Sequence, residues 1–235
     1  MDVAVLEFKI PITSLGVEGD GSGGGWDAFD IGFAGPDIPC FCAGTLIETP
    51  LGLIPIKRIA AGDEVMTLDR GTSRVLWAGQ RRCSPSELAA FEKRRPIRIG
   101  TDALGPDYPV KPVWVSRQYR VLVPGALPQD AGVLAPAVKL TALDGVTIPP
   151  PLAAVTYCHI LLDHHAIVQT HGLHCESLYW GARADEVIQG ATHEILSGLS
   201  STQKAQVLTM APARPFVERA KYVRSFLERL GRTPV

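Results

Sequence analysis

Short runs of alternating apolar and polar residues dominate the chain from about residue 45 to residue 170. Such alternation is typical of strands with one face in a core, and glycine, proline and aspartate separate the runs. Because almost no helical segments lie between the runs, parallel strand–helix–strand units are not expected, and the sequence predicts a mainly β fold. The strands are predicted at 45–49, 54–58, 63–69, 73–81, 96–100, 113–123, 133–140 and 154–170.

Helical patterns are found once inside this region and again after residue 183. Ser84 is a candidate N-cap, with Glu87 three residues later as in a capping box. The segment 200–203 has the same pattern. Between Phe216 and Leu230, apolar residues recur every three to four positions, which predicts an amphipathic helix.

These changes in the pattern of apolar and polar residues divide the chain into three parts. An N-terminal arm with one strand and a glycine-rich linker occupies 1–36, a β domain occupies 37–182, and a helical extension occupies 183–235. Within the β domain, the segment 52–59 is echoed at 132–140 with one residue inserted. This echo favours a domain built from two related halves.

Composition and charge exclude several classes of protein. The net charge of −1 offers no basic excess for a nucleic acid backbone, so no nucleic acid partner is expected. No apolar run of about 18 residues is present, so no membrane span is expected. The N-terminus lacks the features of an ordinary secretory signal, which favours a cytoplasmic protein or one exported by a leaderless route. Five cysteines in 235 residues exclude a disulfide scaffold as the main source of stability.

Cysteine and histidine residues gather near the end of the β region. Two cysteines and five of the six histidines fall within 158–175, which indicates a site. A metal site built from alternate strand residues such as His159, His165 and His171 is one alternative. However, no Cys-x2-Cys pair exists, and Cys40 and Cys42 have only one residue between them.

A cysteine nucleophile is the second alternative, and the residues after Cys40 favour it. The segments 40–52 and 59–69 contain Cys40, then Gly44-Thr45, then a Gly-Asp turn followed by a valine. This order resembles the opening of the hedgehog/intein (Hint) domain family, and 75–82 is similar to the bacterial intein-like subgroup. The resemblance extends over about residues 37–180 and implies a Hint-like β fold with pseudo-two-fold halves.

The remaining landmarks of the family can be placed residue by residue. Ser116 stands where the family has threonine, and Tyr119 stands where it has histidine. Cys158 and His165 match the spacing of the family's catalytic Asp or Cys and a later histidine, and the subgroup's Tyr-x-His pattern places His159. The resemblance therefore implies the catalytic set Cys40, Thr45, Ser116, Tyr119, Cys158, His159 and His165.

The resemblance also implies a reaction and its substrate. The thiol of Cys40 would attack the carbonyl of Pro39, and an N-to-S shift would turn the amide into a thioester. The segment before Cys40 would be the substrate in cis, water or a small nucleophile would be the acceptor, and no cofactor or metal would be needed. Because Glu176-Ser177 replaces the family's terminal His-Asn, cleavage or acyl transfer without full splicing is expected.

Two further interpretations follow from the same residues. Tyr119 is a poor proton shuttle at neutral pH because an ordinary tyrosine has a pKa near 10, which favours a catalytically impaired module with a structural or binding role. A metal-binding β protein using 158–175 is the other. Individual residues also have plain structural explanations: Cys40 as an inert buried thiol, Tyr119 as a core tyrosine, and Thr45 and Ser116 as turn caps.

Overall fold

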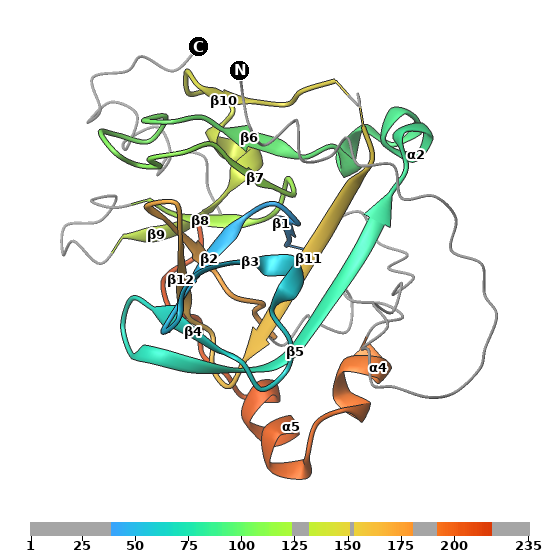
Figure 1. Ribbon diagram of the computed structural model, residues 1–235, viewed down its shortest axis with the longest axis vertical. Helices are drawn as coiled ribbons and strands as arrows, with labels where there is room; N and C mark the ends of the chain where they lie inside the picture. Colours follow the sequence, from blue (N-terminus) through green and yellow to red (C-terminus); the bar gives the residue numbers. More distant parts are fainter. Residues whose placement is uncertain (1–38, 124–131, 151–152, 181–191, 218–235) are drawn as a thin grey trace.

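The computed structural model describes residues 39–123, 132–150, 153–180 and 192–217, and these form a mainly β fold with few helices (Figure 1). The predicted fold class is confirmed. The expected N-terminal strand and glycine-rich linker lie outside the described residues, as does most of the amphipathic helix expected from Phe216. No helix in the described ranges is long and apolar enough to span a membrane.

Thirteen strands are present in the described part of the chain. They are β1 (Phe41–Cys42), β2 (Leu46–Thr49), β3 (Gly52–Pro55), β4 (Glu64–Thr67), β5 (Gly71–Cys83), β6 (Ile97–Ile99), β7 (Val113–Val115), β8 (Arg120–Val123), β9 (Val133–Pro136), β10 (Val146–Thr147), β11 (Val155–Leu162), β12 (Ile167–Thr170) and β13 (Leu173–Glu176). The α-helices are α2 (Pro85–Ala90), α4 (Thr192–Ser197) and α5 (Ser201–Leu208), and the 3-10 helices are η2 (Ile56–Arg58), η3 (Glu92–Arg94) and η4 (Ala137–Leu140).

Eleven of the strands form one curled sheet in the order β10-β6-β7-β1-β11-β5-β4-β12-β13-β8-β9, and β2 and β3 form a separate hairpin. The longest strands, β5 and β11, pair antiparallel and run side by side across the molecule in Figure 1. Because β1 lies between β11 and β7, the start of the domain is held in the middle of the sheet rather than at an edge.

The alternation predicted most strands, and the differences have local causes. The expected strand 113–123 is two strands, because the backbone N–H of Tyr119 donates to the carbonyl of Ser116 and closes a turn between them. The expected strand 154–170 is likewise interrupted between β11 and β12. Both predicted N-caps are confirmed, since Ser84 caps α2 and Ser200 forms a capping box with Gln203 on α5. The expected box at Ser84 is only half formed, because the Glu87 carboxylate bonds to Arg81 and Arg94 instead.

The predicted internal echo corresponds to a repeated structural unit. In each copy a hairpin strand, β3 or β9, passes through a proline into a 3-10 helix, η2 or η4. The two prolines have nearly the same conformation, with φ −56° and ψ 130° at Pro55 and φ −58° and ψ 135° at Pro136. The 3-10 helices are also anchored alike, through hydrogen bonds from Ile56 N–H to Thr45 O and from Ala137 N–H to Tyr119 O, each 2.8 Å long.

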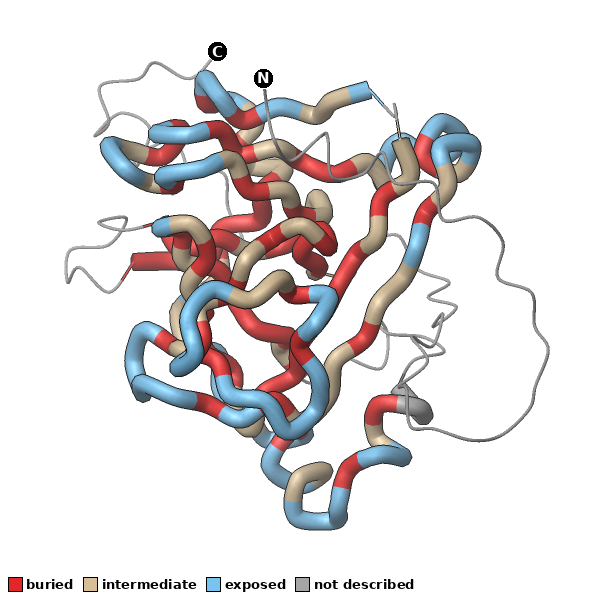
Figure 2. Tube along the Cα trace, viewed as in Figure 1, coloured by how far each residue is buried: buried red, intermediate tan, exposed pale blue. Residues whose placement is uncertain are grey.

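Buried side chains occupy both faces of the curled sheet. In Figure 2 the buried residues, in red, recur along its central strands. The larger cluster includes Phe41, Val115 and Cys158, and the second includes Cys40, Cys42 and Tyr157. Successive residues on a strand project to opposite faces, so Cys40 and Phe41 belong to different clusters. Helices α4 and α5 contribute apolar side chains to the second cluster and so cover the face on which Cys40 lies.

The chain after α5 packs against the outer strand β9 as an extended segment. Phe216 forms a parallel bridge with Leu134, whose backbone N–H and carbonyl bond to Pro215 and Val217 at 2.9 Å each. We call residues 209–217 the C-terminal strap. The expected start of a helix at Phe216 is therefore wrong, because the backbone there pairs with the edge of the sheet.

Candidate active site

Cys40 is fixed by the strand on each side of β1. On the β7 side, Ser116 makes two hydrogen bonds to it: Ser116 Oγ accepts from the Cys40 N–H at 2.9 Å, and the Ser116 N–H donates to the Cys40 carbonyl at 2.9 Å. The Cys40 N–H belongs to the peptide bond between Pro39 and Cys40. A hydroxyl group therefore lies directly beside the nitrogen that would leave in an N-to-S shift.

His159 approaches the same peptide from β11. Phe41 pairs with Cys158, so the next residues in this antiparallel ladder, Cys40 and His159, lie together on the opposite face. The Cys40 Sγ is 2.7 Å from His159 Nε2, and the backbone of Pro39 lies close enough to the imidazole ring to affect its pKa. One imidazole thus contacts the candidate nucleophile and lies next to the residue that carries the candidate electrophile.

Burial sets the protonation states of this pair. It raises the pKa of the Cys40 thiol well above its ordinary value, and the nearby thiols of Cys42 and Cys158 raise it further, whereas the hydrogen bond with Ser116 lowers it. Burial lowers the pKa of His159 to about 3, against a smaller opposite effect of the Pro39 backbone. Near neutral pH the pair is therefore a neutral thiol and a neutral imidazole, and attack requires transfer of the thiol proton to His159.

Tyr119 contributes to the site by packing. Its ring lies on Phe41, with centroids 4.4 Å apart, and its hydroxyl donates to the backbone carbonyl of Glu176. Burial raises the pKa of Tyr119 well above its usual value, with smaller contributions from Cys175, Glu176 and Cys40. The hydroxyl is thus a neutral donor that connects the candidate site to the end of β13.

Thr45 and Cys158 lie close to the site without a hydrogen bond to the Cys40 thiol among the described contacts. Thr45 is buried in the turn after β1, where its N–H donates to Cys42 and its carbonyl accepts from Ile56. Cys158 packs in the cluster that contains Phe41, on the opposite side of the sheet from Cys40. Burial raises the pKa of Cys158 to about 12, which the charge of Lys57 partly offsets.

His165 belongs to a second group of buried polar side chains at the end of β13. Its Nε2 is 3.4 Å from Glu176 Oε2, and its Nδ1 accepts a hydrogen bond from the backbone N–H of Ala213 at 2.9 Å. Because an amide N–H can only donate, Nδ1 carries no proton and Nε2–H faces the carboxylate. The side chains of His165 and Glu176 are both fully buried.

Arg120 completes this second group, and sequence reasoning did not single it out. Its Nη1 lies 3.2 and 3.0 Å from the two carboxylate oxygens of Glu176, and its backbone N–H also donates to that carboxylate at 3.0 Å. Phe216 of the C-terminal strap covers the guanidinium group, 4.2 Å from its ring centroid. The only sequence signal was the position of Glu176 at the end of the family's pattern.

The C-terminal strap also borders a cavity of about 460 Å³ beside the β11–β12 turn. Its lining includes His164, His165, Asp69 and Arg214. Two close polar pairs bound it: His164 with Asp163 at 2.6 Å, and Arg214 with Asp69 through two contacts of 2.5 and 2.9 Å. Because His165 lines it, the cavity adjoins the buried group formed by Arg120, Glu176 and His165, which we call the Glu176 group.

The histidines considered for a metal site do not converge. His159 contacts Cys40, His165 contacts Glu176, and His171 accepts from the Leu46 N–H at 3.3 Å in a different part of the fold. Across the described ranges, no group of three or more His, Cys, Asp or Glu side chains is arranged to hold a metal ion.

Comparisons with known protein families and solved structures show which family the chain belongs to. A family model of the Hint domain matches residues 39–182, and a search of curated proteins finds no match. The chain is similar to the solved bacterial intein-like domain from Clostridium thermocellum, with 17% identity and a TM-score of 0.43 over 59% of this chain and 97% of that one. It is also similar to the gp41-1 intein, with 15% identity and a TM-score of 0.37 over 58% and 97%, and to the zinc-bound Msm DnaB1 intein splicing domain, with 14% and 0.39 over 57% and 98%. Because the family match spans more than half of the chain and includes the segments that bring Cys40, Ser116 and His159 together, this protein belongs to the Hint domain family.

Proposed function

We propose that this chain cleaves itself, or transfers its N-terminal acyl segment, through an N-to-S shift at the Pro39–Cys40 bond. Membership of the Hint family implies autoprocessing in general, with the domain acting in cis on its own chain. The observation that carries the specific proposal is the imidazole of His159, which lies 2.7 Å from the Cys40 thiol and next to the backbone of Pro39.

The proposed step balances within these groups. Cys40 Sγ bonds to the carbonyl carbon of Pro39 while its proton passes to His159. The imidazolium then stabilises the developing oxyanion and gives the proton to the Cys40 nitrogen as the C–N bond breaks. Ser116, whose Oγ accepts from that N–H, lies where it would relay or orient the proton. The product is a thioester between Pro39 and Cys40 with a free amino group on Cys40.

Release of the acyl segment then needs an external nucleophile. Water, a thiol or an amine attacks the thioester and frees residues 1–39. Cyclisation of a terminal asparagine, which frees the other end in splicing inteins, has no counterpart here because Glu176 and Ser177 carry no side-chain amide. Ser177 is moreover held in place, since its Oγ accepts from Ala166 N–H at 3.0 Å. The proposed reaction therefore ends at N-terminal cleavage or acyl transfer.

The first test is chemical release of the N-terminal segment. The full chain would be incubated with hydroxylamine or dithiothreitol and weighed by intact mass spectrometry. We expect a fragment ending at Pro39, and we expect Cys40→Ala to abolish it. Cys42→Ala is the matched control, because that buried thiol lies two residues away and has no hydrogen bond to His159 among the described contacts. An intact wild-type chain would contradict the proposal and favour the impaired module, to which the engagement of Tyr119 with Glu176 also points.

The protonation states of the site predict an unusual dependence of the rate on pH. At saturating hydroxylamine, where the acyl shift limits the rate, the rate should vary little between pH 5 and 8. His159 accepts a proton only near pH 3, so the loss of base that an ordinary histidine shows near pH 6.5 should be absent. Rates at a series of pH values, each checked for independence of hydroxylamine concentration, measure this. An inflection near pH 6.5 would show that the site is solvated.

A further inference from the structure

The two parts of the chain that the proposed reaction would separate carry opposite charge. Residues 1–39 contain seven acidic residues and a single lysine, Lys9, and no lysine or arginine at all follows within 10–39. The remaining 196 residues carry 22 lysines and arginines against 17 acidic residues. The substrate segment is therefore acidic and the domain that would process it is basic.

Basic residues of the domain occupy strand positions next to Pro39, the residue that precedes Cys40. Phe41 pairs antiparallel with Val115, and Ser116 bonds to Cys40, so Arg117 follows on the side from which Pro39 arrives. Strand β6 pairs with β7 in the same region, with Ile97 opposite Val115. The residues leading into β6 include Arg94 and Arg95, so further positive charge approaches this side.

These arginines differ in how many of their N–H groups already have a hydrogen-bond acceptor. Arg94 Nη1 bonds to Glu87, although its Nε is buried without a hydrogen-bond partner in the described residues, and Arg95 Nε donates to the carbonyl of Leu88 at 3.0 Å. In the part of the chain that the structure describes, Arg117 Nη1 is buried and has no hydrogen-bond partner. A buried donor without an acceptor costs about 1–3 kcal/mol, more when it is charged, and a carboxylate is its strongest partner.

We propose that Arg117 binds a carboxylate of the acidic segment that precedes the scissile bond, with Asp37 as its first partner, and that this contact selects acidic substrates. Asp37 stands three residues before Cys40. An extended chain advances about 3.3 Å per residue, so Asp37 lies within about 7 Å of Pro39, a span that an arginine side chain can cover. The contact would hold the peptide extended as it enters the site, which favours attack by Cys40. This inference rests on the proposed function, because the segment it binds is the proposed substrate.

Docking is testable without cleavage. In the full chain carrying Cys40→Ala, amide hydrogen exchange of peptides covering 27–38 reports whether the segment is held. Arg117→Glu and Asp37→Lys should each raise the exchange rates there about three- to tenfold, as loss of one partly buried ion pair predicts. The double variant should restore protection, because the charges are exchanged. Asp37→Asn tests the carboxylate without altering the domain.

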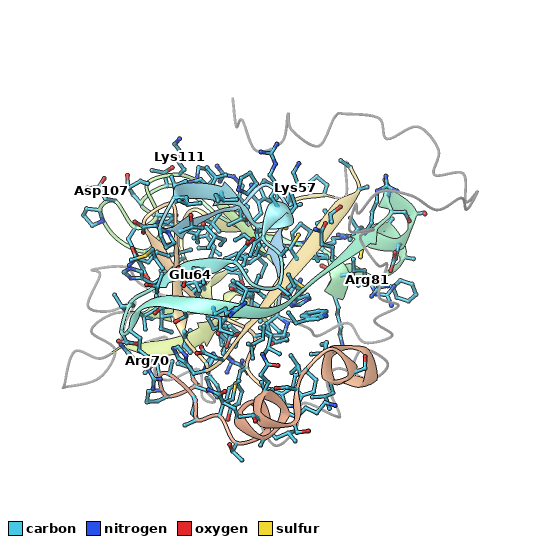
Figure 3. The ribbon with its side chains drawn as sticks, turned by 60° about the horizontal axis from the view of Figure 1, so that its bottom comes forward. Lys57, Glu64, Arg70, Arg81, Asp107 and Lys111 are labelled. Atoms are coloured by element: carbon cyan, nitrogen blue, oxygen red, sulfur yellow. The ribbon has the colours of Figure 1, made fainter. Side chains whose placement is uncertain are left out.

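Arg70→Glu is the matched control, since it reverses a charge at the other end of β5, far from Arg81 in Figure 3. It should leave exchange in 27–38 unchanged. Eleven positions along the chain, at about 3.3 Å each in a strand, separate Arg70 from Arg81, which pairs with Tyr157 opposite Cys42, and the screening length at physiological salt is only about 8 Å. Equal exchange in wild type, Arg117→Glu and Asp37→Lys would overturn the docking proposal. An equal loss of protection in Arg70→Glu would also overturn it, because it would show that the effect comes from the overall charge of the domain and not from Arg117.

The same variants, made in the chain that keeps Cys40, separate this inference from the proposed function. Hydroxylamine release should slow about three- to tenfold in Arg117→Glu and recover in the charge-exchanged double variant. Charge-dependent protection without any wild-type cleavage would support docking and overturn the proposed reaction. Cleavage of the wild-type chain at a rate that Arg117→Glu and Asp37→Lys do not change would support the proposed reaction and overturn the docking proposal.

Discussion

Replacement of His159 by glutamine is expected to slow release of residues 1–39 by about 10²–10⁴-fold, the usual range for loss of a general acid–base group. The Cys40 thiol is neutral in the folded protein, because burial raises its pKa, so it cannot attack without a base. His159 Nε2 lies 2.7 Å from the sulfur and is the base that we propose. Single-turnover release in hydroxylamine, followed by intact mass, measures the effect.

Two matched variants distinguish this effect from a general disturbance. His164→Gln changes a histidine just after the end of the same strand, β11, which pairs with Asp163 rather than with Cys40, and should change the rate less than about threefold. Tyr119→Phe removes a hydroxyl that donates to the Glu176 carbonyl and should likewise leave a measurable rate. Wild-type rates in His159→Gln would show that the thiol proton leaves by another route.

The sequence predicted the fold class well because the relevant signal is local. Alternating runs indicate strands wherever one face is buried, and the Hint resemblance predicted from the opening motif is confirmed by the family match. The echo of 52–59 at 132–140 also proved structural, because a proline at the end of a strand forces the same entry into a 3-10 helix in both copies. Each of these features depends on neighbours in sequence.

The arrangement of the candidate site was less accessible to sequence reasoning. Cys40 and His159 are 119 residues apart, and their contact depends on the register of β1 against β11, which no local pattern specifies. Family resemblance placed His159 at the site, but spacing alone gave His165 and His171 equal standing. The roles of all seven candidate residues stay predictions, although the structure brings Cys40, Ser116 and His159 into direct contact.

The sequence did not predict the buried Arg120–Glu176–His165 group, and the reason is different. Charged residues are normally exposed, so an arginine and a glutamate in strand patterns indicate a solvated face. Here the C-terminal strap covers them: Ala213 donates to His165, and Phe216 lies over Arg120. The apolar periodicity from Phe216 onward predicted a helix, most of which lies outside the described residues. At Phe216 itself the backbone pairs with the free edge of β9 instead.

Arg120→Met is expected to lower the free energy of unfolding by about 3 kcal/mol, near the lower end of the range for a broken buried ion pair. The substitution leaves the fully buried carboxylate of Glu176 without its cation, while the side chain of Arg120 was itself 27% exposed and so lost less hydration on folding. Guanidinium unfolding of the full chain with Cys40→Ala, which prevents cleavage, measures the change.

The pairing itself is isolated by a double-mutant cycle with Glu176→Gln. If the cost of Arg120→Met arises from the stranded carboxylate, the double variant should be more stable than Arg120→Met alone, because an amide needs no counter-charge. Arg214→Met is the matched control. It also breaks a two-contact arginine–carboxylate pair, but Asp69 is 41% exposed, so the expected loss is only about 0–1 kcal/mol. Equal losses in Arg120→Met and Arg214→Met would show that the strap does not seal the Glu176 group from water.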